Sequence, residues 1–159
     1  MNAKGQALAK QFEAKVHDAT ATIETLGDAD WTKVTAAETW TVGVTAHHLA
    51  GALEPVAMMT KTLASGGSVP HFTEDMLHAM NAKHAKDFAN CTKAETIELL
   101  KKAAATAAAV VRDLSDDQLA KSGTVFAGAP PMTAEQLVTR GLIGHIDEHF
   151  GSIRKTVGR

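Results

Sequence analysis

Two histidines four residues apart, His145 and His149, are the residues in this sequence whose spacing most directly indicates chemistry. On a helix, residues with this spacing project from one face, with roughly 5–6 Å between their Cβ atoms. Two imidazole rings at that separation can bind one ion, with bonds of about 2.0–2.1 Å if the ion is zinc. Leu142 and Val138 continue the same face, so we expect both rings to point into the protein. The spacing alone is weak evidence, because the chain contains eight histidines.

The same segment, which reads HIDEH over residues 145–149, also matches the inverted zinc-peptidase pattern H-x-x-E-H. In that chemistry Glu148 is the general base, and a third, carboxylate ligand follows further along the chain. Only ten residues follow His149, and none of them is acidic. We therefore reject the peptidase interpretation, and Glu148 remains a weak catalytic candidate.

A third ligand is expected from a different helix, and residues 40–50 contain two candidates, His47 and His48. His48 shares a helical face with Val44, Thr45 and Ala52, which are small enough to pack in a core. His47 points about a third of a turn away, on the face of two glycines. Helical geometry alone does not choose between the two rings.

The elements that must position these histidines are all expected to be helices, because alternating β-branched runs are lacking. A polar connection is expected over residues 28–39 and a loop over 123–132. Pro55 should bend or break the second helix. Capping-box patterns open the helices at Thr92 and Thr133. The predicted helical segments are 3–26, 41–65, 73–90, 92–114, a short turn at 115–118, and 133–157.

Composition places further bounds on the protein. The chain has 159 residues, most simply one all-α domain over residues 1–159, with 16 basic and 18 acidic side chains. This balance indicates neither a nucleic-acid nor a membrane partner, since both usually require a basic face. The single cysteine, Cys91, fits a reducing compartment. The first residues include no apolar stretch typical of a signal peptide, so we expect a cytoplasmic protein.

These patterns together resemble the DinB/YfiT-like metalloenzymes, a family that includes the N-terminal domain of mycothiol-dependent maleylpyruvate isomerase. The second helix of that family opens with a pattern like W-[ST]-V-x-x-x-x-x-H-L-A. Its last helix carries H-x-x-x-H, often followed by R-G-Q. Here Phe150 and Ser152 replace the arginine and the glutamine, which leaves the substrate open. The residues that match the first pattern are Trp40, Thr41, Val42, His48, Leu49 and Ala50.

The resemblance implies a four-helix bundle in the order up-down-down-up, with an extra short helix or turn. It selects His48 over His47 and implies one divalent metal ion held by His48, His145 and His149. Nickel and zinc are the first expectations for this ion, and iron and cobalt are the alternatives. The resemblance also implies a homodimer and, for some members, chemistry that uses a low-molecular-weight thiol.

Two classes of function follow from these features. The first is a metal-dependent enzyme acting on a small molecule, either a thiol-dependent transferase or isomerase or a hydrolase. The second is a metal-binding helical module without turnover, stress-related or partner-binding. Glu54 and Glu148 are weak catalytic candidates, and His84 and Asn81 are expected to line the pocket. The roles of His47 and His78 stay open.

Overall fold

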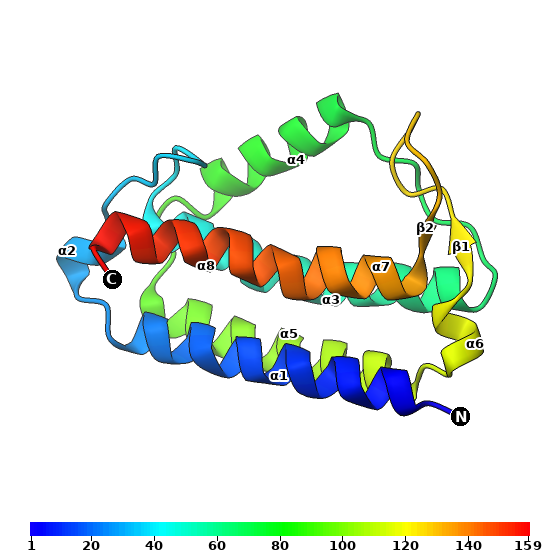
Figure 1. The fold of residues 1–159 in the computed structure, drawn as a ribbon. Helices are drawn as coiled ribbons and strands as arrows, with labels where there is room; N and C mark the ends of the chain where they lie inside the picture. The colour runs from blue at the N-terminus through cyan, green and yellow to red at the C-terminus, as the bar shows by residue number, and fades with distance from the viewer.

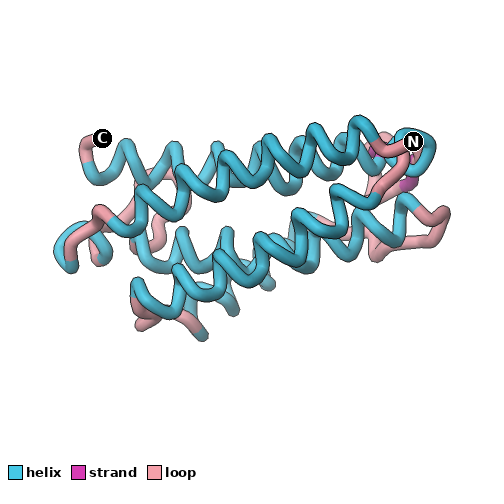
Figure 2. The backbone as a smooth tube through the Cα atoms, turned by 90° about the horizontal axis from the view of Figure 1, so that it is seen from below, coloured by secondary structure: helices cyan, strands magenta, loops and turns pink.

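Four long helical segments form a bundle in the computed structural model, which describes residues 1–159 (Figure 1). Followed by colour, α1 and the C-terminal segment run in one direction, and α3 and α5 run in the other. The predicted all-α bundle is confirmed, and these directions are compatible with the expected up-down-down-up order. Figure 2 shows the long helices aligned along a common direction, with the short strands at one end. The segments are α1 Ala3–Glu24, α3 Val42–Ala64, α5 Lys93–Asp113, and a C-terminal run of α7 Ala134–Val138, η1 Thr139–Ile143 and α8 Gly144–Val157.

One hydrophobic core of 33 buried residues joins these helices. On α1, Leu8, Phe12 and Ile23 recur at helical spacing and face the bundle interior. Helix α5 packs against both α1 and α3. Its contacting face includes Ala103 and Ala107, whose small side chains allow neighbouring backbones to approach closely. None of the helices has the length and mean hydropathy needed to cross a membrane.

Side-chain caps fix where the helices begin. The Thr92 hydroxyl accepts a hydrogen bond from the Glu95 N–H, and the Glu95 carboxylate accepts one from the Thr92 N–H. Thr133 and Gln136 make the same reciprocal pair at the start of α7. Both predicted capping boxes are therefore confirmed, and each satisfies two amide groups that have no partner within the helix.

The connections contain more structure than expected. A short helix, α2 Asp28–Trp31, lies in the predicted polar connection, and the predicted turn at 115–118 forms α6 Asp116–Leu119. The predicted loop over 123–132 is bounded by two short antiparallel strands, β1 Ser122–Gly123 and β2 Met132–Thr133. Each strand is only two residues long, too short to show an alternating pattern in the sequence.

Helix α3 continues through Pro55, where a bend or break was expected. Proline has no N–H, so the carbonyl of Gly51, four residues earlier, loses its donor within the helix. Both residues lie on the exposed side of α3. The carbonyl can therefore be solvated, which lowers the cost of the missing hydrogen bond.

Helix α4, Glu74–Asp87, lies across the bundle rather than within it (Figure 1). It contains no buried residue, and among the helices it packs mainly on α3. Its apolar residues Leu77 and Met80 share one side with Asn81 and His84, because these positions recur at intervals of three and four. That side faces a cavity, which explains why no residue of this amphipathic helix is fully buried.

The C-terminal segment is helical throughout, as predicted, but it is not a regular α-helix. Within η1 the Gly144 N–H donates to the Thr139 carbonyl, five residues back. Such an i→i+5 turn inserts one extra residue and rotates the preceding residues relative to those that follow. The side of the helix on which a residue of α7 lies therefore does not continue onto α8 with regular α-helical spacing.

Candidate metal centre

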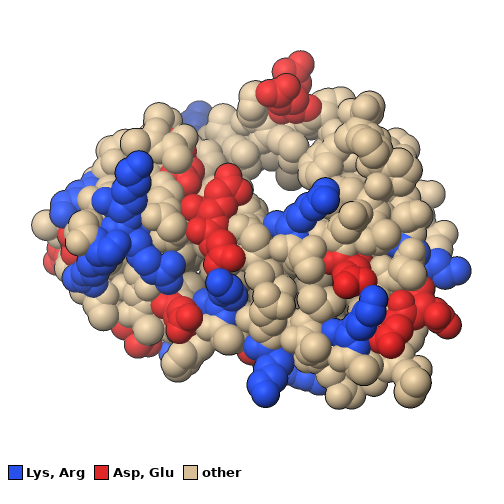
Figure 3. Space-filling view, viewed as in Figure 1, with Lys and Arg blue, Asp and Glu red and all other residues tan.

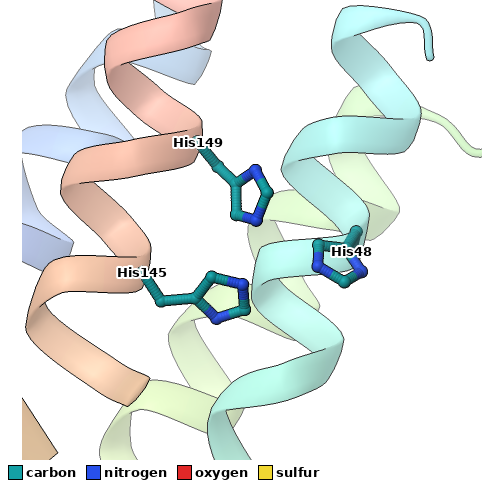
Figure 4. A group of neighbouring side chains, drawn as sticks. All are labelled: His48, His145 and His149. Carbon is teal, nitrogen blue, oxygen red and sulfur yellow. The ribbon is translucent and has the colours of Figure 1, made fainter. Parts of the chain in front are cut away.

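Three histidines from two helices meet between α3 and α8 (Figure 4). His48 comes from α3, and His145 and His149 come from successive turns of α8. One ring nitrogen from each lies within 4.8 Å of the other two. The structure thus brings together the three residues selected by the resemblance, with His48 rather than its neighbour His47 in the group.

His149 is held in place by a buried carboxylate, Glu38. The His149 Nδ1 atom donates to Glu38 Oε1 at 3.0 Å, and the Ser152 hydroxyl donates to Oε2 at 2.7 Å. The two side chains of the His149–Glu38 pair are only 9% and 8% exposed. A carboxylate on one ring nitrogen fixes the tautomer and leaves Nε2 free to bind a metal. Ser152, one of the two departures from the family pattern, thus supports a candidate ligand.

The charge on Glu38 is maintained by its hydrogen bonds. Burial raises the pKa of its carboxyl, but hydrogen bonds from Ser152, Thr35 and His149 outweigh burial and hold the pKa below its ordinary value. The residue lies in a tight turn in which the Thr35 N–H donates to the Trp40 carbonyl. Within this turn Thr39 has a φ of 63°. A β-branched residue in that left-handed region is strained, and such strain is concentrated at functional sites.

Sequence reasoning missed Glu38, which fell within the polar connection predicted over residues 28–39. It is separated from His149 by 111 positions along the chain. No local pattern marks it, because its role depends on how the turn before α3 packs against α8.

The rings of His48 and His145 are neutral over a wide pH range. Burial, with the neighbouring histidine rings adding to it, lowers the pKa of His48 from 6.5 to about 3. Burial and the nearby His149 lower the pKa of His145 to about 4, although a hydrogen bond with the Gly141 backbone opposes this shift. Neutral imidazoles are the form that binds metals. With His149, these rings supply three imidazole nitrogens from two converging helices, a donor set that fits one divalent transition-metal ion.

A second histidine pair lies beside this group. The His47 Nδ1 and His84 Nε2 atoms are 2.8 Å apart and share one hydrogen bond, which joins α3 to α4. The His47 ring also stacks on Phe88, with 4.1 Å between ring centroids. Burial lowers the pKa of both histidines. The Nδ1 atom of His84 is buried without a hydrogen-bond partner.

A cavity of about 1020 Å³ separates α4 from the bundle, and His48 and His145 lie in its wall. The space-filling view shows the corresponding hollow beneath the arch formed by α4 (Figure 3). Helix α3 and the C-terminal segment form the floor, and α4 forms the roof. The pocket candidates His84 and Asn81 both line the cavity from α4.

The remaining candidates lie elsewhere. Glu54 is exposed and lines a separate pocket between α3 and α5, where Leu99 and Ala103 form the other wall. Glu148 is exposed on α8 and does not line the large cavity. His78 is exposed on α4, 3.9 Å from Glu74.

Comparison with known proteins identifies the family and a similar fold. No curated protein matches the chain. One solved structure of similar fold is a histidine-to-alanine mutant of mycothiol-dependent maleylpyruvate isomerase, with a TM-score of 0.71 at 10% sequence identity. The alignment covers 96% of this chain but only 60% of that one, so this chain spans about three fifths of its neighbour's length. The model of the DinB superfamily matches residues 11–153, which confirms the resemblance read from the sequence: the chain belongs to the DinB superfamily.

Proposed function

We propose that His48, His145 and His149 bind one divalent transition-metal ion, with nickel or zinc as the first expectation and iron or cobalt as alternatives. The support is chemical: three neutral nitrogen donors suit these ions better than magnesium or calcium, which prefer oxygen. Glu38 adds to this support, because metal-binding histidines almost always donate their second N–H to a carboxylate, a carbonyl or water.

We further propose that the protein is an enzyme that acts on a small molecule at this metal. The observation that carries this proposal is the position of His48 and His145 in the wall of the 1020 Å³ cavity. A structural metal site is closed by protein ligands, whereas a catalytic one keeps a position open to substrate. When bound, the metal supplies a Lewis acid that activates water or binds a thiolate. The Asn81 amide can hydrogen-bond a substrate from the roof.

The proposed reaction is a thiol-dependent transfer or isomerisation, or a hydrolysis. The neighbouring structure supports the first class, because that protein is named as a thiol-dependent isomerase. A low-molecular-weight thiol is accordingly the proposed co-substrate. A homodimer is proposed from the resemblance alone, and light scattering on the purified protein tests it.

A metal-binding module without turnover is the second candidate. It is favoured by one observation: no carboxylate lines the cavity, so no acidic general base faces a bound molecule there. In this case the metal would stabilise the bundle or a partner-binding surface, and the cavity would not give exogenous ligands access to the metal.

Metal analysis tests the site. Protein purified without a histidine tag should contain close to one transition-metal ion per chain. His48→Ala or His149→Ala should remove most of this metal, whereas His47→Ala should keep it, because His47 bonds to His84 rather than joining the three-histidine group. A preparation that binds none of the four metals would overturn the proposal.

Cobalt substitution then separates the enzyme from the module. An open coordination position allows an added small thiol to reach Co²⁺ and produce a sulfur-to-cobalt absorption band. An unchanged cobalt spectrum at saturating thiol, azide and cyanide would instead favour a closed, non-catalytic site. Azide and cyanide serve as controls, since they need little space.

A further inference from the structure

The wall of the large cavity contains one permanently charged side chain, Arg140. Of the 24 residues that line the cavity, none is a lysine, an aspartate or a glutamate. Apolar side chains from every wall make up much of the rest, among them Met59, Phe72, Leu77 and Phe126. A largely apolar cavity with a few polar side chains and one permanent charge is typical of a site for a small, mostly apolar molecule held in one orientation.

Arg140 has no partner within the protein. It makes no salt bridge and no side-chain hydrogen bond, whereas the other three arginines, Arg112, Arg154 and Arg159, each do. A guanidinium offers a planar fork of donors that matches a carboxylate, so its natural partner here is an acidic ligand.

The π-helical turn explains why Arg140 faces the cavity. On a regular α-helix, residues five apart point about 140° away from each other. Arg140 and His145 are five apart, yet both line the same cavity. The Gly144-to-Thr139 hydrogen bond of η1 inserts the extra residue that brings them onto one side. π-Helical turns are frequent at functional sites, and this one aligns a cation with a candidate metal ligand.

We propose that the cavity binds a small carboxylic acid with an apolar body, its carboxylate paired with Arg140 about one helical turn from His145. The apolar body extends beneath α4 towards Phe72 and Phe126, whose side chains line the cavity and are partly exposed. This inference deepens the proposed function. It rests on that proposal in one respect, because it places the carboxylate of the ligand near the proposed metal ion. The pairing with Arg140 itself needs no metal.

A matched pair of probes tests this inference. 4-Phenylbutyrate and 4-phenyl-1-butanol have the same apolar body and differ in charge. Binding is measured by calorimetry on metal-free protein, so that the carboxylate cannot bind a metal instead. We expect the acid to bind about tenfold more tightly than the alcohol, since a hydrogen-bonded charge pair contributes about that factor. Arg140→Gln should abolish this preference and leave alcohol binding unchanged.

Lys155→Gln is the matched control. Lys155 is exposed on the same helical run, makes no salt bridge and does not line the cavity, so its removal changes net charge equally. This variant should keep the tenfold preference. Equal binding of acid and alcohol to the unmodified protein, no binding of either, or a preference that survives Arg140→Gln would overturn the inference. A failed metal titration would overturn the proposed function alone, because the probe measurement uses metal-free protein.

Discussion

The hydrogen bond between Glu38 and His149 orients the ring of one candidate ligand. Replacing Glu38 by glutamine keeps the size of the side chain but removes its charge. We expect the variant to bind Ni²⁺ or Zn²⁺ about 10- to 100-fold more weakly, the usual effect of losing such a supporting partner. Competition with a chromophoric chelator measures the change.

Glu148→Gln is the control for this substitution. It removes the same charge from an exposed position next to His149, where the side chain makes no hydrogen bond. Its affinity for metal should equal that of the unmodified protein. Equal affinities for the Glu38 and Glu148 variants would show that the carboxylate does not support the ligand.

The pKa values of His48 and His145 predict how the metal-free protein responds to acid. Their pKa values in the fold, about 3 and about 4, lie below the ordinary 6.5. Between these lowered pKa values and 6.5, the unfolded chain binds more protons than the folded one, so the free energy of unfolding falls as the pH drops. We expect the Tm of the metal-free protein to fall from about pH 6.5 to pH 4.

A His48→Gln, His145→Gln double variant tests the cause of this loss. Glutamine cannot be protonated in this range, so the variant should show a flatter dependence of Tm on pH. Melting curves at constant ionic strength measure both proteins. An identical slope in the two would assign the acid sensitivity to other groups.

The candidate ligands could be predicted because helical periodicity is a local property. The spacing of His145 and His149 shows in the sequence that both rings project from one face. The choice of His48 over His47 required the family resemblance, because adjacent positions differ by only about 100° and both faces are weakly polar. Glu38 could not be predicted, since its role depends on packing between a turn and a helix far apart along the chain.

At the scale of elements, α3 contains two glycines with opposite surroundings. A Cβ at Gly43 would lie 2.5 Å from Nε1 of Trp31, whose ring is held by a 2.9 Å hydrogen bond to the Cys91 carbonyl. A Cβ at Gly51 would meet nothing within 4 Å. We expect Gly43→Ala to lower the free energy of unfolding by about 1–3 kcal/mol through overpacking.

Gly51→Ala provides the comparison on the same helix. Alanine has a higher helix propensity than glycine, so this variant should be more stable by up to about 1 kcal/mol. Urea denaturation measures both. A loss of stability in both variants would mean that α3 tolerates no side chain at either position, contrary to the open space at Gly51.

The π-helical turn also belongs to this scale, and it could not be predicted. Residues 139–143 include Gly141, but a single glycine does not indicate an i→i+5 turn, and the capping box at Thr133 indicates only where the helix begins. The extra residue is accommodated by packing: a Cβ at Gly141 would lie 3.0 Å from Val56 Cγ1, so the C-terminal segment lies close against α3 there. A contact between two helices, rather than a local pattern, accompanies the change of register.

For the whole molecule, the contrast between α4 and the bundle predicts unequal stability. Helix α4 has no buried residue, whereas α5 carries seven. Local opening needs little energy where few apolar contacts are lost. We expect amide hydrogens of α4 to exchange much faster than those of α5, as measured by hydrogen–deuterium exchange. A ligand in the cavity should slow exchange in α4 selectively, and equal protection of both helices without ligand would contradict the prediction.

The bundle itself was largely predictable, because each long helix has its own apolar stripe, cap or glycine stop. The cavity beneath α4 could not be predicted from the sequence. Leu77, Met80 and His84 show helical spacing in the sequence, but that pattern indicates burial against protein and not against a cavity. Whether an apolar face meets a neighbouring helix depends on how the connections before and after α4 direct it.

The ring of Trp40 lies 5.1 Å from that of His48, measured between centroids. The chain contains two tryptophans and no tyrosine, and the other tryptophan, Trp31, lies on α2 with its indole nitrogen bonded to a carbonyl. The protein's ultraviolet emission therefore comes from two indoles, one of which lies beside the candidate metal ligands. Binding of a quenching ion such as Ni²⁺ should dim Trp40, so the protein contains its own optical reporter of metal occupancy.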